Sequence, residues 1–268
     1  MKYLYETHLH TCQGSACGIS KGCEYPKLYQ DLGYDGLFVT DHFFQGNCAA
    51  PRNGVWKDRV DAYMAGYLDA LNAGEKIGFK VFFGIEQNYS GDEYLLYGID
   101  RDFLLDNPDI EHVSRDTLFE RVHAYGGCVV QAHPFRERGY IGKMHFQLDG
   151  IDAVEAVNMG NHPHEDACAL KYAAHQGLPV TGGSDIHNSL KVTPDRICAT
   201  ALGEKINSAK EYAARIRQGK GISLVYPAER LHGVLPQMPL TPFEAGRDGK
   251  IIEDFDLEQY IKQEEYEL

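Results

Sequence analysis

The chain has 268 residues, 43% of them hydrophobic, and a formal net charge of −13. This length and apolar fraction suffice for one large domain, and the negative charge argues against nucleic acid such as duplex DNA as a general partner. No apolar run approaches the roughly 20 residues that cross a bilayer, so we expect no membrane role.

The cysteines predict a reducing compartment. There are seven, an odd number, and none forms a CxxC pair. The opening stretch MKYLYETHLH lacks the pattern of a secretory signal. We therefore expect a cytoplasmic protein with free thiols.

Short apolar runs alternate with longer amphipathic stretches along the chain, which predicts repeated βα units and a mostly parallel sheet. The predicted strands cover 3–9, 36–40, 80–86, 94–99, 127–132, 152–158, 179–184, 197–202 and 221–226. The predicted helices cover 25–32, 58–77, 114–125, 164–176 and 207–217. Ser114 and Ser208 are placed to cap the helices that follow them.

The chain changes character after residue 226, where it becomes proline-rich and then acidic. We expect residues 1–226 to form one α/β domain, a barrel, and 227–268 to form an extension that packs on this barrel or trails from it. This extension would be an appended strand or loop with a short surface helix, or would be partly disordered.

Ionisable residues follow the predicted strands repeatedly, at the carboxyl ends where parallel α/β folds build their sites. A histidine pair such as His8 and His10 is, alone, more commonly a packed core or surface feature. Six strand ends bearing imidazole or carboxylate are harder to ascribe to chance, and such ligands together suit Zn, Mn or Fe. The residues are His8, His10, Asp41, His42, Glu86, His133, Glu155, Asn158, Asp185 and His187.

Five motifs in this order, ETHLHT, VTDH, GIE, AHP and GGSDIH, resemble the PHP superfamily, named for polymerase and histidinol phosphatase. The resemblance covers about residues 3 to 226 and implies an α/β fold, a distorted (β/α)7 barrel. It also implies two to three divalent metal ions and hydrolysis of phosphate esters. By this resemblance one ion is held by His8, His10, Glu86 and Asp185, a second by Glu86 and His133, and a third by His42 and His187.

Two places depart from the family pattern. Ser15 and Ala16 stand where the family has a ligand of the third ion, so this ion should be the most weakly bound. Cys17 is the nearest substitute, although a simply reduced cysteine is the more common case. In the stretch NMGNHPHED, Asn161 aligns best with a family ligand, and the neighbouring His162 and His164 compete with it.

Two arginines follow His133 and are candidates for binding substrate phosphate, because guanidinium groups match phosphate oxygens in a bidentate manner. Arg136 is the candidate clamp and Arg138 its neighbour, with Arg196 in reserve. The alternative is a salt bridge, for example to Glu137. Aromatic residues at Phe43, Phe44 and Trp56 could line a pocket, but such residues are more often core.

The sequence therefore predicts a metal-dependent phosphatase that cleaves a small phosphomonoester, for example histidinol phosphate, by metal-activated hydroxide. His187 or His42 would protonate the leaving alkoxide if free of metal. Two other classes stay open: a non-catalytic metal-stabilised or regulatory PHP domain, and an amidohydrolase-type hydrolase. The sequence does not indicate an oligomeric state.

Overall fold

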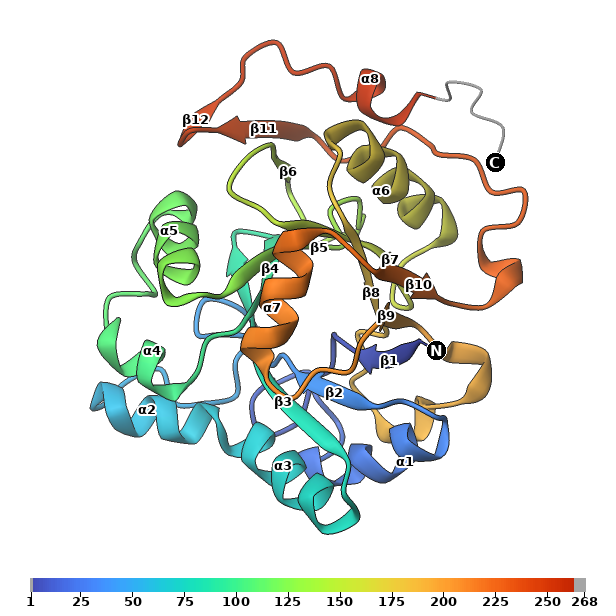
Figure 1. The fold of residues 1–268 in the computed structure, drawn as a ribbon. Helices are drawn as coiled ribbons and strands as arrows, with labels where there is room; N and C mark the ends of the chain where they lie inside the picture. The colour runs from blue at the N-terminus through green and yellow to red at the C-terminus, as the bar shows by residue number, and fades with distance from the viewer. Residues whose placement is uncertain (1, 263–268) are drawn as a thin grey trace.

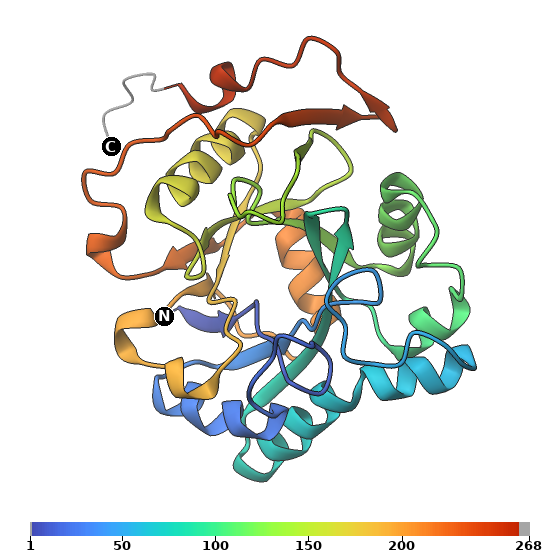
Figure 2. The same cartoon turned by 180° about the vertical axis from the view of Figure 1, so that it is seen from behind.

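The computed structural model describes residues 2–262, and its main feature is a nine-stranded sheet curled into a nearly closed barrel (Figures 1 and 2). All nine predicted strand regions form its strands, so the α/β barrel is confirmed. In order across the sheet they are β10 (Ile222–Val225), β9 (Ala199–Leu202), β1 (Tyr3–Glu6), β2 (Gly36–Val39), β3 (Lys80–Tyr89), β4 (Asp92–Tyr97), β5 (Cys128–Ala132), β7 (Ala153–Asn158) and β8 (Val180–Gly183).

The expectation of seven strands in a mostly parallel sheet is wrong, since half of the eight strand pairings are antiparallel. The cause at β4 is a hairpin whose two-residue loop, Ser90 and Gly91, has positive φ at both positions. Such a loop joins antiparallel neighbours and leaves no room for a crossover helix. As a result β4 begins at the end of the barrel where β3 finishes.

The open seam of the barrel lies beside β8 and is closed by side chains rather than by strand pairing. Thr7 Oγ1 donates to the Gly182 carbonyl at 3.0 Å, and the Gly182 N–H donates to Thr200 Oγ1 at 3.0 Å. These bonds satisfy backbone groups of β8 that have no strand partner on that side. They also fix the chain on either side of His8 and Asp185.

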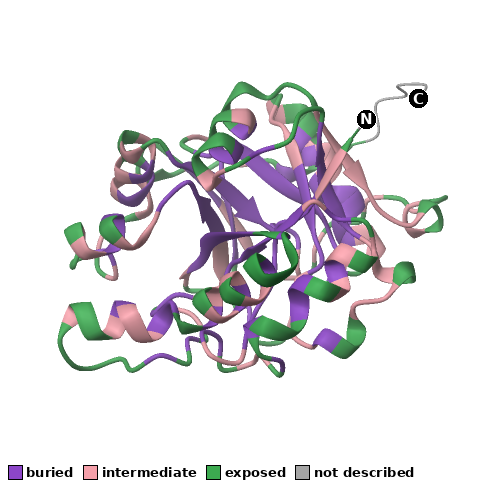
Figure 3. Ribbon diagram, turned by 60° about the horizontal axis from the view of Figure 1, so that its bottom comes forward, coloured by how far each residue is buried: buried purple, intermediate pink, exposed green. Residues whose placement is uncertain are grey.

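Most helices lie outside the sheet with their exposed faces outward, while the helix at 209–218 lies across one end of the barrel (Figure 1). Most strands of the sheet are buried, and the strand at 222–225 is half-buried (Figure 3). The predicted helix 58–77 is two helices with Met64 between them. The second begins where the chain packs tightly on the barrel, since a Cβ at Gly66 would lie 2.0 Å from Thr11 Oγ1. Ser114 and Ser208 cap their helices as predicted. The helices are α1 (Tyr25–Asp31), α2 (Trp56–Tyr63), α3 (Ala65–Ile77), α4 (Arg101–Asp106), α5 (Arg115–Tyr125), α6 (Pro163–Gln176), α7 (Ala209–Gln218) and α8 (Leu257–Ile261).

Aromatic side chains fill the barrel at the end opposite the predicted site. Tyr212 of α7 packs against Phe38 and Tyr97 with ring centroids 4.7 and 4.9 Å apart, and Phe38 stacks on Phe82 at 4.9 Å. All four rings are buried. This end is therefore closed by apolar packing, and the polar residues of the interior lie toward the other end.

A second, three-stranded sheet joins the C-terminal segment to the barrel. It consists of β6 (Met144–Gln147), which the sequence did not predict, and of β11 (Phe243–Arg247) and β12 (Lys250–Ile251) in the C-terminal extension. β11 pairs with β6 in parallel, and α8 packs on α6. The strand and short helix agree with one of the forms expected for the extension, whose last residues, 263–268, lie outside the described part. None of the helices in residues 2–262 combines the length and apolarity needed to cross a membrane.

Candidate metal centre

Eight side chains with metal-binding atoms converge at one end of the barrel. The strand ends bring them together because parallel strands finish at the same edge of a sheet. Seven were predicted and Glu93 was not. They are His8 and His10 after β1, His42 after β2, Glu86 in β3, Glu93 in β4, His133 after β5, and Asp185 and His187 after β8.

The distances between their ligand atoms fit shared metal ions. His8 Nε2 and His133 Nε2 each lie 3.1 Å from Glu86 Oε1, and His10 Nε2 lies 3.1 Å from Asp185 Oδ1. Two ligands about 2.1 Å from a tetrahedral ion are about 3.4 Å apart. The clusters His8–Glu86–His133 and His8–His10–Asp185 are thus compatible with metal binding.

Four of these buried atoms make no hydrogen bond within the described residues: His8 Nε2, His10 Nε2, His42 Nδ1 and Glu86 Oε2. His42 Nδ1 and Glu86 Oε2 lie 2.6 Å apart, and His8 Nε2 and His10 Nε2 each lie 3.1 Å from a carboxylate oxygen, but none of these contacts is aligned for a hydrogen bond. A buried polar atom without a partner costs free energy, and a shared cation would remove that cost. The residues present therefore fit the metal that the sequence resemblance implies.

A buried carboxylate fixes the orientation of His8. His8 Nδ1 lies 2.9 Å from Glu155 Oε1, and both side chains are fully buried. The carboxylate accepts a hydrogen bond from the Nδ1–H, so Nε2 is the nitrogen that faces Glu86 and Asp185. Glu155 is in turn held by Asn158, whose amide donates to Oε2 at 2.9 Å.

Ser15 has a comparable role toward His10. Its hydroxyl donates to Asp41 Oδ1 at 2.6 Å and accepts from the backbone N–H of His42 at 2.9 Å. The remaining contact, 3.0 Å to His10 Nδ1, must then be one that the imidazole donates. Ser15 therefore stands where the family has a ligand, yet in this chain it sets the tautomer that frees His10 Nε2.

Charge and burial together determine the protonation of the centre. Burial alone would raise the pKa of Glu86, but the imidazoles of His42 and His8 outweigh it and hold that pKa well below its usual range. Asp185 behaves likewise, with His8 and Arg136 lowering its pKa against the effect of burial. Burial and the neighbouring His187 and His42 lower the pKa of His10, which keeps this imidazole neutral. Against the effect of burial, Glu155 raises the pKa of His8 and Glu86 raises that of His42. The ionised carboxylates and neutral His10 are thus in the form that binds metal, whereas His8 and His42 would release protons on binding it.

The backbone is strained at two of these positions. His133 has φ +29° and Asp185 has φ +52°, values in a backbone region that residues other than glycine seldom adopt. The remaining described non-glycine residues with positive φ are the turn residues Ser90 and Asp248. Strain of this kind persists where surrounding contacts hold it and is common in functional sites.

Arg136 is buried beside the centre and holds Asp185. Its Nη2 lies 2.7 Å from Asp185 Oδ2 and 2.9 Å from Asn158 Oδ1, and its Nε donates to Asn161 Oδ1 at 2.9 Å. Nη1 makes no hydrogen bond within residues 2–262. The salt-bridge alternative is thus correct for Arg136, with Asp185 rather than Glu137 as the partner, and Nη1 is the atom left for a ligand.

The other predicted arginines are committed elsewhere. Arg138 pairs with Glu165 at 2.9 Å and donates to the Gly160 carbonyl, and it does not line the cavity over the centre. Arg196 donates to the Met159 carbonyl at 3.1 Å. Arg136 is therefore the predicted phosphate-binding residue that the structure brings to the site.

The uncertain ligands near residue 161 are not brought together with the centre. Asn161 uses its oxygen for Arg136 and donates its amide to Asp166. His162 begins α6, and its ring stacks on that of His164 at 5.7 Å, outside the metal-ligand clusters of the described residues. Cys17 does face His42 and His187, and these imidazoles lower its pKa to about 6 although burial opposes this.

A cavity of about 480 Å³ opens over the centre. Its lining includes Arg136, Glu93 and Cys17 together with the exposed ring of Tyr140. Phe43 and Phe44 are instead buried in the core against Trp56, as the more common alternative predicted. The cavity is polar at its floor and open to ligands of small size.

The C-terminal segment reaches this site through Arg230, which sequence analysis missed. Its Nε donates to Asp166 Oδ2 at 2.7 Å, and its Nη2 donates to the carbonyls of Asn158 at 2.7 Å and Asn161 at 3.0 Å. Those asparagines contact Arg136, so a chain of buried polar contacts runs from the extension to Asp185. No motif indicates this contact, because it joins residues 64 to 72 positions apart in the sequence.

Glu93 was missed for a different reason. It belongs to the strand that was expected to be parallel, and a parallel β4 would place its first residues at the opposite end of the barrel. The dipeptide Ser90–Gly91 was the available indication, since serine and glycine favour tight turns.

No protein-family model matches the chain, and no curated protein sequence does. Solved structures match its fold. A two-domain protein from Bacteroides vulgatus containing a predicted PHP-like metal-dependent phosphoesterase superposes with a TM-score of 0.57 at 13% identity, over 84% of this chain and 65% of that one. The lesion-specific endonuclease PfuEndoQ from Pyrococcus furiosus gives 0.52 at 14%, over 84% and 58%.

A third match is an amidohydrolase from Chromobacterium violaceum with bound sulfate, which gives a TM-score of 0.50 at 13% identity over 84% of this chain and 98% of that one. The chain thus spans less than two thirds of the length of the first two proteins. At these identities the likeness concerns the fold alone, which is PHP-like. The buried His and carboxylate clusters in this fold are candidate metal sites.

Proposed function

We propose that the protein is a metal-dependent phosphatase that hydrolyses a small phosphomonoester. The single observation that carries this proposal is the set of buried, unpartnered ligand atoms on His8, His10, His42 and Glu86 beneath an open cavity. Divalent ions bound there would supply a water of lowered pKa and offset the negative charge of a phosphoryl group. Two to three ions of Zn, Mn or Fe suit these ligands.

The residues of the chain would bind and orient the ester around the ions. Arg136 lines the cavity, and the contacts of its Nε and Nη2 with Asn161, Asn158 and Asp185 leave Nη1 for a ligand. A guanidinium fixed in this way matches a phosphate oxygen without losing side-chain freedom on binding. It would bind the phosphoryl group in the ground state and in the transition state.

A proton for the leaving alkoxide would come from His187 or His42. His187 Nδ1 lies 2.9 Å from the carbonyl of Asp185, so it donates there and leaves Nε2 as the atom that can carry the transferred proton. His187 is the more exposed of the two histidines and lines the cavity, where it can meet the leaving group.

The size and charge of the molecule favour a small ester. A cavity of about 480 Å³ holds a ligand of metabolite size, and the net charge of −13 disfavours a long polyanion. Histidinol phosphate is one candidate of this size, although no contact in the site selects its imidazole. A cytoplasmic location would suit such a substrate and the seven free thiols.

The test is a phosphatase assay on chelator-treated protein reconstituted with Zn, Mn or Fe. The substrates are p-nitrophenyl phosphate, histidinol phosphate and a panel of metabolite monoesters, with bis-p-nitrophenyl phosphate and an amide panel beside them. We expect metal-dependent release of phosphate from a monoester, abolished in Asp185→Asn and kept in Asp109→Asn, which alters an exposed aspartate paired with Arg121.

Three outcomes would contradict the proposal. Faster turnover of the diester would change the substrate class, and turnover of amides alone would favour an amidohydrolase. No metal-dependent turnover of any substrate would favour a regulatory domain.

A further inference from the structure

Glu93 shares one face of the β3–β4 hairpin with Glu86. In the antiparallel register Glu86 is opposite Leu95 and Asn88 is opposite Glu93, so Glu86, Asn88 and Glu93 lie on the same side of the sheet. That side is the barrel interior above the metal centre. The hairpin therefore delivers two carboxylates to one site from adjacent strands.

The two oxygens of Glu93 lie at ligand spacing from two histidines of the centre. Glu93 Oε2 is 3.5 Å from His133 Nε2, and Glu93 Oε1 is 3.7 Å from His42 Nδ1. These separations are close to the edge of about 3.4 Å that two ligands of one tetrahedral ion define. His42, Glu86 and Glu93 also form one of the clusters whose ligand atoms all lie within 4.8 Å of one another.

The negative charge of Glu93 is offset in part by the imidazoles of His133 and His42, and a bound cation would offset it in their place. Its side chain is 12% exposed, and its hydrogen bond within the described chain is from Asn88 Nδ2 at 2.9 Å. The neighbouring carboxylate of Glu86 repels it, and Arg136 is occupied by Asp185. Two buried carboxylates side by side need a compensating positive charge.

The site at His133 is short of ligands without Glu93. With His8 assigned to the first ion, His133 and Glu86 supply two donors, and Asn161, which aligns with a family ligand, has both amide atoms engaged by Arg136 and Asp166. Catalytic metal sites commonly have three protein ligands and a position open for water or substrate. Glu93 would bring the site to three.

We propose that Glu93 is a metal ligand of this chain, completing with His133 and Glu86 the second ion of the centre. This inference rests on the metal centre of the proposed function and replaces the ligand lost at Asn161 by a carboxylate from a different strand. The antiparallel direction of β4 is required for this role, since only that direction places Glu93 at the end of the barrel with the metal centre, here called the metal end.

The test counts ions in Glu93→Gln, which keeps the shape of the side chain and removes its charge. Chelator-treated protein is equilibrated at graded free Zn, and bound metal per chain is measured by elemental analysis. Asp92→Asn is the matched control, since Asp92 is the neighbouring residue of the same strand and pairs with Arg115 away from the centre.

We expect Glu93→Gln to bind one ion at least about tenfold more weakly than the parent, and Asp92→Asn to keep the parent's binding curve. Metal-free Glu93→Gln should melt at a higher temperature than the metal-free parent, because the repulsion from Glu86 is removed. A residue that only packs the hairpin would give the opposite shift. If Glu93→Gln does not fold, Glu93→Asp retracts the carboxylate and should weaken the same ion.

An unchanged metal count and affinity in Glu93→Gln would overturn the inference. This result is distinct from failure of the proposed function. A parent that binds no ion contradicts both, and a parent that loses an ion in Glu93→Gln but hydrolyses no phosphate ester contradicts the proposed function alone.

Discussion

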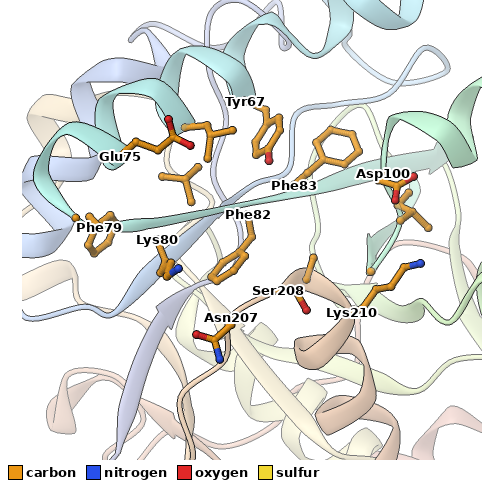
Figure 4. A pocket seen from close by; sticks show the side chains of 16 residues that line it. Tyr67, Glu75, Phe79, Lys80, Phe82, Phe83, Asp100, Asn207, Ser208 and Lys210 are labelled. Atoms are coloured by element: carbon orange, nitrogen blue, oxygen red, sulfur yellow. The ribbon is translucent and has the colours of Figure 1, made fainter.

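The two ends of the barrel both carry cavities, and the larger cavity is not the one with the chemistry. The end opposite the metal centre has a cavity of about 620 Å³ between α3 and α7, crossed by β3 (Figure 4). The metal end has about 480 Å³. Volume alone would therefore not identify the metal end of the molecule.

The difference lies in whether polar groups already have partners. At the larger cavity Ser208 caps α7, Asp100 caps α4, and Lys210 lies over the Tyr125 ring at 4.1 Å. At the metal end four buried nitrogen and oxygen atoms make no hydrogen bond within the described residues. A polar group that caps a helix or packs on a ring has a structural role. The buried ligand atoms without a partner at the metal end have none, so a bound ligand is the explanation we favour.

The largest effect is expected from the loss of His8, a predicted ligand of the first ion. His8→Ala removes a nitrogen that faces both Glu86 and Asp185. We expect kcat/KM to fall about a thousandfold or more, because metal charge stabilisation contributes several kcal/mol to the barrier. Steady-state assays with p-nitrophenyl phosphate measure kcat/KM, and far-ultraviolet circular dichroism checks that the variant is folded. Parent-like turnover would make the cluster structural.

Substitution of Arg136 tests whether the metal end also binds phosphate directly. Arg136→Ala removes Nη1 from the cavity and the ion pair from Asp185, so we expect KM to rise and kcat to fall, together about a hundredfold in kcat/KM. Arg136→Lys should recover only part, since lysine cannot reproduce the fork. Unchanged KM in both variants would leave phosphate binding to the ions.

Arg230 connects the metal end to the C-terminal segment, so its substitution tests whether that segment affects activity as well as stability. Arg230→Ala leaves buried Asp166 without its cation and should lower the free energy of unfolding by about 3 to 5 kcal/mol. Through Asn158 and Asn161 it should also lower kcat/KM about tenfold below the melting temperature. Arg121→Ala, an exposed pair with Asp109, is the control. Lost stability with parent-like kinetics would limit Arg230 to packing.

The smallest effect is expected at the opposite end. Ser208→Ala removes the side-chain oxygen that accepts from the Glu211 N–H and should cost about 1 kcal/mol of stability. Chemical denaturation measures this cost, and kcat/KM should equal that of the parent. A large loss of activity in Ser208→Ala would mean that the larger cavity takes part in function.

Sequence patterns predicted what local physics determines. Apolar runs located all nine strands of the barrel sheet, and the resemblance singled out seven ligand candidates among the polar residues at strand ends. Glu93 was out of reach because the direction of β4 depends on a two-residue turn, and Arg230 because its partners are distant in the sequence. Likewise, Ser15 could be seen as a missing ligand, but its bond to His10 depends on Asp41 lying behind it.

The central claim is that the unpartnered atoms at the metal end bind ions, and anomalous diffraction from crystals of zinc-loaded protein tests it most directly. We predict a peak about 2.0–2.3 Å from His8 Nε2, His10 Nε2 and the carboxylates of Glu86 and Asp185, and a second beside His133 and Glu93. A third peak between His42 and His187 should be the weakest, since Ser15 supplies no anionic ligand there. Peaks confined to surface residues, or none at this end of the barrel, would contradict the account.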